Sequence, residues 1–238
     1  MKQPVRFYTD ILYPFQDGIL RIVKELNTPF YLTGGTALSR YYFNHRFSDD
    51  LDLFVNSNDS YDRYVDLIFQ ALEKCQKSSH FAIDYLHLRK EEHYAQFFLR
   101  QETVLSDEPV ELKIDIVNDL ASHYGNIKYH EALGRIDSWR NILSNKLSAI
   151  FRYESKDYVD IWIISKKRAF NWKEIIREAK TKEAGIDPIV IYEILMSFPP
   201  DVLSSIKWNM KVDEKAFVND LSIIANDIFK GNENTLFL

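Results

Sequence analysis

The stretch that most restricts the fold of this chain spans residues 30–55, FYLTGGTALSRYYFNHRFSDDLDLFV. A short apolar strand (PFYL) stops at the adjacent Gly34 and Gly35, and a short helix is expected over residues 36–43. A second strand, LDLFV, then follows three aspartates that occupy four consecutive positions. Only 7 of the 238 residues are glycine, so two adjacent glycines ahead of the three aspartates indicate a role beyond ordinary turn formation.

The second strand has one apolar and one acidic face. Asp50 and Asp52 are two residues apart, so in an extended strand both side chains leave the same face with Cα atoms about 6.5 Å apart. Two carboxylates at this spacing repel each other unless a cation lies between them, and paired divalent metals are a common arrangement in phosphoryl-transfer sites. Asp49 is interpreted as a solvated residue at the strand start, which is also the simpler interpretation of the whole D-D-x-D run.

A third carboxylate comes from the segment VELKIDIVN. Its apolar residues alternate, which sends Glu111, Lys113 and Asp115 to the other face. If this strand lies beside LDLFV, Asp115 joins Asp50 and Asp52. The Gly34-Gly35-Thr36 turn, between a strand and a helix, can hold phosphate through backbone N–H groups and the helix N-terminus. We therefore expect the glycines to hold phosphates and the aspartates to hold the metal ions bound to them.

The order of predicted elements indicates an α+β fold. Helices are expected at residues 10–26, 36–43 and 59–75, and strands at 29–32, 51–55, 81–88, 94–100 and 110–117, which fits a mixed sheet covered by helices on one side. After Asn118 only helical patterns are found, near 138–150, 157–166, 172–183, 187–197 and 213–229, with Ser138 as a helix cap. We place the boundary in the loop-like stretch ASHYGNIKYHEALGRID, so that residues 1–125 form one domain and 126–238 an all-α domain.

Composition excludes several classes of protein. Cys75 is the only cysteine, so no internal disulfide or multi-thiolate zinc site can form. The formal net charge of −5 argues against indiscriminate nucleic-acid coating but leaves room for a local basic surface. No signal peptide and no apolar run of membrane-spanning length is found, so we expect a cytoplasmic protein that does not contact a membrane. The six histidines show no metal-ligand spacing and are interpreted as surface or loop residues.

Four motifs in order, TGGTALS, HRFSDDLDL, ELKIDIV and NKLSAIFRYESKDYVDIW, resemble the nucleotidyltransferases of the AbiEii/AbiGii toxin family. The resemblance covers about residues 28–165. It implies a polymerase-β-like nucleotidyltransferase domain, followed by a helical domain that completes the nucleotide and acceptor cleft. It also implies an Mg²⁺-dependent transfer of NMP from an NTP to a cellular acceptor, plausibly tRNA, by the toxin of a type IV toxin-antitoxin system of phage defence. A cognate antitoxin need not bind this toxin directly.

The same resemblance assigns roles to individual residues. Asp50, Asp52 and Asp115 are implied to hold two Mg²⁺ ions, and Asp115 could also accept the proton of the attacking hydroxyl. The remaining implied roles are nucleotide binding by Gly34, Gly35, Thr36, Arg46, Ser48 and Lys146, and a catalytic role for Lys146 and Asp157. Thr36 stands where the superfamily usually has serine and Lys156 where arginine is common, so the choice of nucleotide stays open.

Lys146 and Asp157 are 11 residues apart, close to three helical turns, so on one continuous helix they share a face. The alternative is a helix break around Glu154 and Ser155, with Ser155 capping a new helix. Further along, the segment SKKRAFNWKEIIREAKTK carries seven basic and two acidic residues with Phe170 and Trp172 between them. It is either an RNA-binding face with stacking aromatics or a solvated helix whose aromatics lie in the core.

Three other functions compete with nucleotidyl transfer to RNA. A metal-dependent nuclease also uses three carboxylates and two metals, although it has no triphosphate to hold and so no need for the glycine turn or the spaced lysine. A noncatalytic binding module could keep the fold, but it would not require three intact carboxylates. A small-molecule nucleotidyltransferase, such as one that modifies antibiotics, shares the chemistry and differs only in its acceptor.

Overall fold

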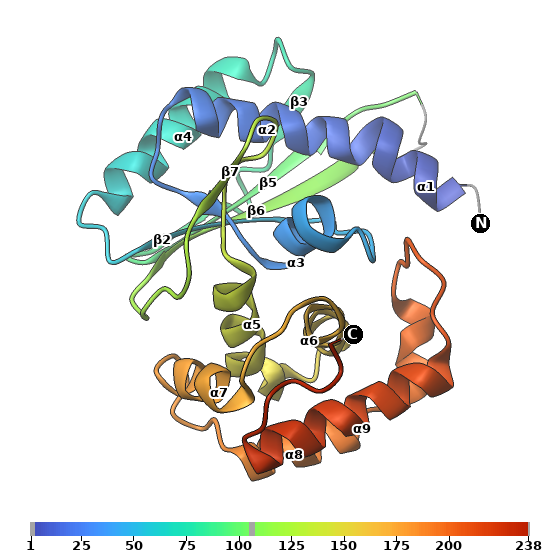
Figure 1. Cartoon of the computed structure of the whole chain (residues 1–238). Coiled ribbons are helices and arrows are strands. Elements are labelled where there is room, and N and C mark those ends of the chain that lie inside the picture. The colour runs from blue at the N-terminus through green and yellow to red at the C-terminus, as the bar shows by residue number, and fades with distance from the viewer. Residues whose placement is uncertain (1–2, 105–107, 238) are drawn as a thin grey trace. The chain divides into compact units, whose positions relative to one another are not determined.

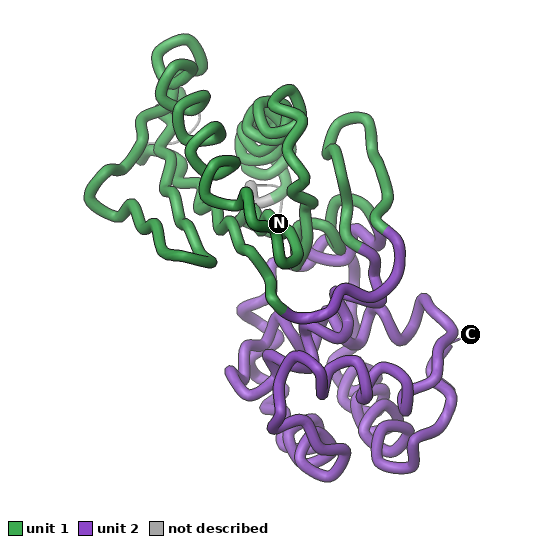
Figure 2. The backbone as a smooth tube through the Cα atoms, turned by 90° about the vertical axis from the view of Figure 1, so that its left-hand side faces the viewer, with its two compact units in different colours: residues 1–41, 47–120, 127–137 green, residues 42–46, 121–126, 138–238 purple. Residues whose placement is uncertain are grey.

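The computed structural model describes residues 3–104 and 108–237. The chain divides into two compact units, coloured separately in Figure 2. Unit 1 contains residues 1–41, 47–120 and 127–137, and unit 2 contains residues 42–46, 121–126 and 138–238. The chain therefore passes between the units several times, and each unit is described by itself below.

Unit 1 is built on an eight-stranded mixed sheet. Along the sheet the strands run in the order β3, β5, β6, β2, β1, β8 and β7, with β4 paired to β5. The pairs β2–β6 and β1–β8 are parallel and the other pairs are antiparallel. The strands are β1 (Tyr31–Leu32), β2 (Leu51–Asn56), β3 (Phe81–Ile83), β4 (Arg89–Lys90), β5 (Tyr94–Gln101), β6 (Val110–Asp119), β7 (Lys128–His130) and β8 (Gly134–Ile136).

Helices cover one face of this sheet. Two long helices, α2 (Tyr13–Glu25) and α4 (Tyr61–Cys75), contact each other over the sheet (Figure 1). Both helices bury apolar side chains, such as Ile19 and Ile68, and the inward residues of β2 and β6 are also buried. The short helix α1 (Gln3–Phe7) and a π-helical turn (Tyr8–Leu12) precede α2. A second short helix, α3 (Gly34–Ala37), continues as π-helix over Leu38–Phe43.

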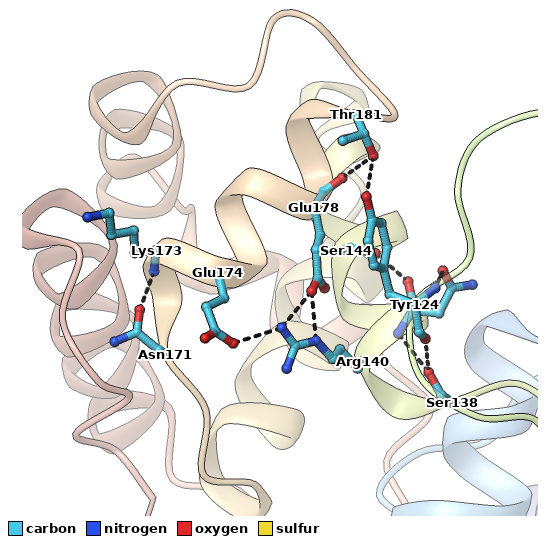
Figure 3. Close-up of polar contacts among 10 residues, drawn as sticks. Tyr124, Ser138, Arg140, Ser144, Asn171, Lys173, Glu174, Glu178 and Thr181 are labelled. Carbon is cyan, nitrogen blue, oxygen red and sulfur yellow. Dashed lines mark hydrogen bonds and ion pairs between the residues drawn. The ribbon is translucent and has the colours of Figure 1, made fainter.

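Unit 2 contains five α-helices among its described residues, and they pack mainly as α5 on α6 and α7, and α9 on α6, α7 and α8 (Figure 1). The helices are α5 (Trp139–Ser148), α6 (Ser155–Lys167), α7 (Trp172–Lys180), α8 (Pro188–Met196) and α9 (Glu214–Lys230), with 3-10 turns at Ile150–Arg152 and Pro200–Ser205. Polar contacts between side chains join α5 to α7. Arg140 of α5 donates to Glu174 and Glu178 of α7, and Tyr124 contacts Thr181 (Figure 3).

Most of the predicted elements are present, and the mixed sheet with covering helices is confirmed. Ser138 caps α5 by accepting a hydrogen bond from the backbone N–H of Asn141, as predicted. The helix break between Lys146 and Asp157 is also confirmed, because Tyr153 has a left-handed backbone and α6 begins at Ser155. However, Ser155 does not cap the new helix, since the cap position is occupied by Glu154.

The expected loop after Asn118 is wrong in part. Residues 128–130 and 134–136 form β7 and β8, and β8 extends the sheet by pairing with β1. Strands of three residues, one of which begins at Gly134, carry too little alternation to be detected by pattern alone. As a result, residues 127–137 lie in unit 1, and the compact units do not coincide with a single cut at residue 125.

Candidate active site

The centre of the candidate site lies where β2 and β6 run side by side. Asp52 and Asp115 are register partners on these two parallel strands. Because side chains alternate along a strand, both carboxylates leave the face opposite the buried Leu51, Leu53 and Ile114. The sequence-based prediction that Asp115 joins Asp52 is confirmed by this register, and Asp50 precedes Asp52 by two residues on the same side.

Gly34 brings the glycine turn against this carboxylate pair. Its φ of +65° lies in the left-handed region, which glycine adopts without steric cost. A Cβ atom at this position would lie 2.3 Å from Oδ2 of Asp52, a distance that side chains do not tolerate. The turn and the aspartate can therefore be in contact only because residue 34 lacks a side chain.

Hydrogen bonds also tie the glycine turn to β2. The backbone N–H of Thr33 donates to the carbonyl of Asp52 at 2.9 Å. Thr36 is fully buried, and its hydroxyl donates to the carbonyl oxygen of Asp50. The side chain predicted to bind nucleotide is thus engaged with the backbone that precedes β2. Ser48 is also buried, and its carbonyl accepts a hydrogen bond from Gln16.

Asp115 is contacted by Tyr94, Gln96 and Lys113, of which the first two come from a strand that no sequence pattern placed at the site. Tyr94 and Gln96, on β5, donate to its Oδ1 at 2.9 Å and 2.7 Å. Burial and the hydrogen bond to Asp115 raise the pKa of the Tyr94 hydroxyl to about 12, so this group remains a donor at neutral pH. Lys113 Nζ lies 3.0 Å from Oδ2 of Asp115 and 3.3 Å from Oδ2 of Asp50.

The donor set of this face has the chemistry that a divalent cation requires. Carboxylate oxygens are the ligands that Mg²⁺ prefers, and Asp50, Asp52 and Asp115 supply them from adjoining strand positions. Within the described part of the chain, however, no three acidic, histidine or cysteine side chains converge as a metal site. The ammonium of Lys113 contacts two of the three carboxylates instead.

Unit 2 contains a second group of charged residues around Asp160 of α6. Arg46 donates to both oxygens of Asp160 at 2.8 Å, and Lys146 Nζ lies 2.8 Å from Oδ2 of Asp160. Lys146 also contacts Oδ1 of Asp157 at 2.7 Å. The two residues lie on different helices, α5 and α6, so the expectation that they share a face of one continuous helix is wrong. Asp157 receives a further contact from Arg152 at 2.9 Å. The side chains of Arg46, Asp157 and Asp160 are at most 3% exposed.

Electrostatics explain how this buried cluster stays charged. Burial alone would raise the pKa of Asp160, but the charges of Arg46 and Lys146 hold it well below its usual range. Burial would likewise lower the pKa of Lys146, and the two aspartates raise it. Lys146 is therefore a charged ammonium whose position is fixed by Asp157 and Asp160.

His45 corrects one interpretation of the sequence. It was expected at the surface or in a loop, yet it is fully buried, with Nε2 at 2.9 Å from Oδ1 of Asp160. Burial lowers its pKa, so the ring is neutral and Nε2 donates to the carboxylate. The sequence alone gave no signal for this contact, because His45 and Asp160 are 115 residues apart and meet only through the folding of unit 2.

Comparison with known proteins places these features in a family. The sequence matches, over residues 19–217, the family described as the nucleotidyl transferase AbiEii toxin of type IV toxin-antitoxin systems. This match covers most of the chain and includes all four motifs. The chain belongs to the AbiEii family. The resemblance inferred from the motifs is thus confirmed, and the AbiEii assignment supports a transferase activity and a toxin role.

Individual proteins are similar to this chain in sequence or in fold. An uncharacterised protein of Aquifex aeolicus, aq_aa25, is 29% identical over 171 residues, which cover 71% of this chain and 73% of that protein. The crystal structure of JHP933 from Helicobacter pylori has a similar fold, with a TM-score of 0.63 at 20% identity over 97% of this chain and 93% of that one. A putative nucleotidyltransferase from H. pylori gives 0.60 at 20% identity, over 97% and 96% of the two chains.

No helix in the described ranges of this AbiEii chain is long and apolar enough to cross a membrane.

Proposed function

We propose that this AbiEii-family protein transfers a nucleoside monophosphate from an NTP to a hydroxyl group of RNA, with tRNA as the acceptor class. The observation that supports this reaction most directly is the contact of the glycine turn with the carboxylate pair. Gly34 lies against Asp52, and Asp52 is in register with Asp115. A phosphate-binding turn beside metal-binding carboxylates is what attack on the α-phosphate of an NTP requires, whereas a nuclease has no use for such a turn.

In this proposal Asp50, Asp52 and Asp115 hold two Mg²⁺ ions. When bound, the ions neutralise the triphosphate and lower the pKa of the attacking hydroxyl. Tyr94 and Gln96 both donate to Oδ1 of Asp115, so Oδ2, which Lys113 contacts in this structure, is the oxygen assigned to accept the proton of that hydroxyl. Phosphate contacts from the turn fall to backbone N–H groups, because the Thr36 hydroxyl is engaged with the Asp50 carbonyl. Pyrophosphate leaves without a covalent enzyme intermediate.

The charged cluster of unit 2 has a positioning role in this proposal. Within unit 2, Asp157 and Asp160 hold the ammonium of Lys146, the lysine to which the resemblance assigns the nucleotide phosphates. Arg46 is buried and bonded twice to Asp160, which also binds Lys146. We therefore assign Arg46 the task of fixing Asp160, rather than direct contact with nucleotide. Replacing Lys146 with Met should raise the KM for NTP.

A basic groove in unit 2 supports RNA as the acceptor. The groove has a volume of about 630 Å³, and its floor contains the apolar side chains of Ile176 and Ile228. Four exposed cations line it, namely Lys173, Arg177 and Lys180 of α7 and Lys230 of α9. The structure gives none of these four an ion-pair partner among the residues it describes. A row of unpaired cations in an acidic protein is suited to the phosphates of a nucleic acid.

The aromatic residues of this segment do not belong to the groove. Trp172 is fully buried and Phe170 is 7% exposed, so the interpretation of both as core residues is confirmed. Instead, the half-exposed ring of Phe229 lies at the groove and can stack on an unpaired base. The groove thus combines phosphate contacts with one aromatic surface.

Incubation with Mg²⁺, each α-labelled NTP in turn and total tRNA tests the reaction. We expect labelled RNA that is longer than the input, and no label with Asp52→Asn. Shortened RNA without label would favour the nuclease, and label on a small molecule would favour the antibiotic-type enzyme. For the groove, fluorescence anisotropy with tRNA should show an affinity loss of about tenfold or more for Arg177→Glu/Lys180→Glu. Lys74→Glu/Lys77→Glu in unit 1 is the charge-matched control.

A further inference from the structure

Lys113 occupies a position at the carboxylate site that the proposed reaction does not yet explain. It lies on β6 two residues before Asp115, so the alternation of the strand directs it to the same face. Its ammonium bridges Asp115 and Asp50, at 3.0 Å and 3.3 Å, with the side chain 30% exposed. The bridge therefore spans the first and last of the three carboxylates.

The bridge has the properties of a built-in counter-ion. Within the described residues Lys113 is the ion-pair partner of both Asp50 and Asp115. An ammonium is a compact charge on a flexible four-carbon stem and has only donors, so it binds the same carboxylate oxygens that a metal ion needs. It supplies one positive charge to three carboxylates, which leaves the group short of the charge that divalent ions would provide.

We propose that Lys113 makes metal binding at Asp50, Asp52 and Asp115 conditional on nucleotide. A metal ion that arrives alone must break both ion pairs of Lys113 and leave its ammonium close to a second cation. A metal ion that arrives with a triphosphate brings the negative charge to which the released ammonium moves. Lys113 is thus a positioning residue that opposes the bare metal and favours the metal–nucleotide complex. This proposal rests on the nucleotidyl-transfer function proposed above.

Two binding constants with opposite expected changes test this role. The first is the affinity for Mn²⁺ without nucleotide, from the electron paramagnetic resonance signal of the free ion. The second is the affinity for a non-reactive α,β-methylene NTP with Mg²⁺, from equilibrium dialysis. Lys113→Met keeps the length of the side chain and removes its charge. Lys90→Met is the matched control, because Lys90 also pairs with a carboxylate of unit 1, Asp66, at 2.5 Å.

We expect Lys113→Met to bind Mn²⁺ about tenfold or more tightly than the unmodified protein, since a like charge has been removed beside the ion. The same variant should bind the NTP analogue about tenfold more weakly, because the ammonium no longer meets the triphosphate. Lys90→Met should leave both constants unchanged. A general loss of structure would weaken both affinities together, so opposite changes identify the proposed role.

An Mn²⁺ affinity of Lys113→Met equal to or weaker than that of the unmodified protein would overturn the proposal, and so would an unchanged affinity for the NTP analogue. The proposed function would stand in either case if Asp52-dependent labelling of RNA persists. A third outcome is that no Mn²⁺ binding is detected, with or without the NTP analogue, in the unmodified protein, Lys113→Met or Asp52→Asn. In that case both this proposal and the metal-binding role of the carboxylates are wrong.

Discussion

Replacement of Gly34 by Ala separates the two reasons for a glycine at this position. The first is conformational, because a non-glycine residue in the left-handed region costs about 1–2 kcal/mol. The second is steric, because the new Cβ would lie 2.3 Å from Oδ2 of Asp52, while ordinary contact begins at 3.4 Å. The carboxylate must therefore move by about 1 Å, and a displacement of this size at a reacting centre costs about 10²-fold in rate.

Gly134 provides the matched control. Its φ is +76°, similar to that of Gly34, but nothing lies within 4 Å of a Cβ built there. We expect Gly34→Ala and Gly134→Ala to lose about 1–2 kcal/mol of unfolding free energy each, measured by urea denaturation. Only Gly34→Ala should lose about 10²-fold in the rate of label transfer from NTP.

The reasoning would be refuted if Gly34→Ala transferred label within threefold of the Gly134→Ala rate. That result would show that the contact between the glycine turn and Asp52 does not matter for the reaction. A third substitution, Gly18→Ala, serves as a check on the stability scale. Gly18 lies in α2, and a Cβ at this position would meet nothing within 4 Å, so alanine should stabilise the helix by about 0.5–1 kcal/mol.

Three further predictions concern unit 2. Burial lowers the pKa of His45, so below about pH 6.5 the unfolded chain takes up a proton that the folded chain does not, and the unfolding free energy should fall between pH 7.5 and 5.5. His45→Gln should flatten this pH dependence, and an unaltered dependence would contradict the prediction. Asp160→Ala leaves Arg46 and Lys146 without this partner and should lower the unfolding free energy, measured by urea denaturation, by about 3–5 kcal/mol. A loss below about 1 kcal/mol would contradict this prediction. Arg140→Met leaves the buried carboxylate of Glu178 without its guanidinium partner and should lower the unfolding free energy by about 1–3 kcal/mol. The double variant Arg140→Met/Glu178→Gln should recover part of this loss, because the charge of Glu178 is removed.

The local parts of the fold were predictable from the sequence because they depend on short-range patterns. The alternation in VELKIDIV gave the correct inward and outward faces of β6, and Ser138 was recognised as the cap of α5. The same alternation placed Asp50 and Asp52 on one face of β2, whereas it left open whether β6 lies beside β2, as it does in the structure. Such features are set by the period of the polypeptide backbone, which is written directly in the residue order.

The remaining parts of the site depend on contacts that no local pattern specifies. Tyr94 and Gln96 reach Asp115 because β5 pairs antiparallel with β6 in one particular register. No local pattern singles out Asp160, because its bonds to His45 and Arg46 join it to a segment more than 110 residues away. Long-range pairing of this kind is decided by the packing of whole elements, so single-sequence reasoning identifies the strands and helices without identifying these partners.

The position at which the NTP is cleaved tests the central claim most directly. The purified protein would be incubated with Mg²⁺, tRNA and the same NTP labelled at either the α- or the γ-phosphate, beside Asp50→Asn/Asp52→Asn. The account predicts that the α label appears on RNA and the γ label appears in pyrophosphate, in equal amounts and only with intact aspartates. Transfer of the γ label to RNA, or release of the γ label as free phosphate without labelled RNA, would contradict attack at the α-phosphate and with it the proposed nucleotidyl transfer.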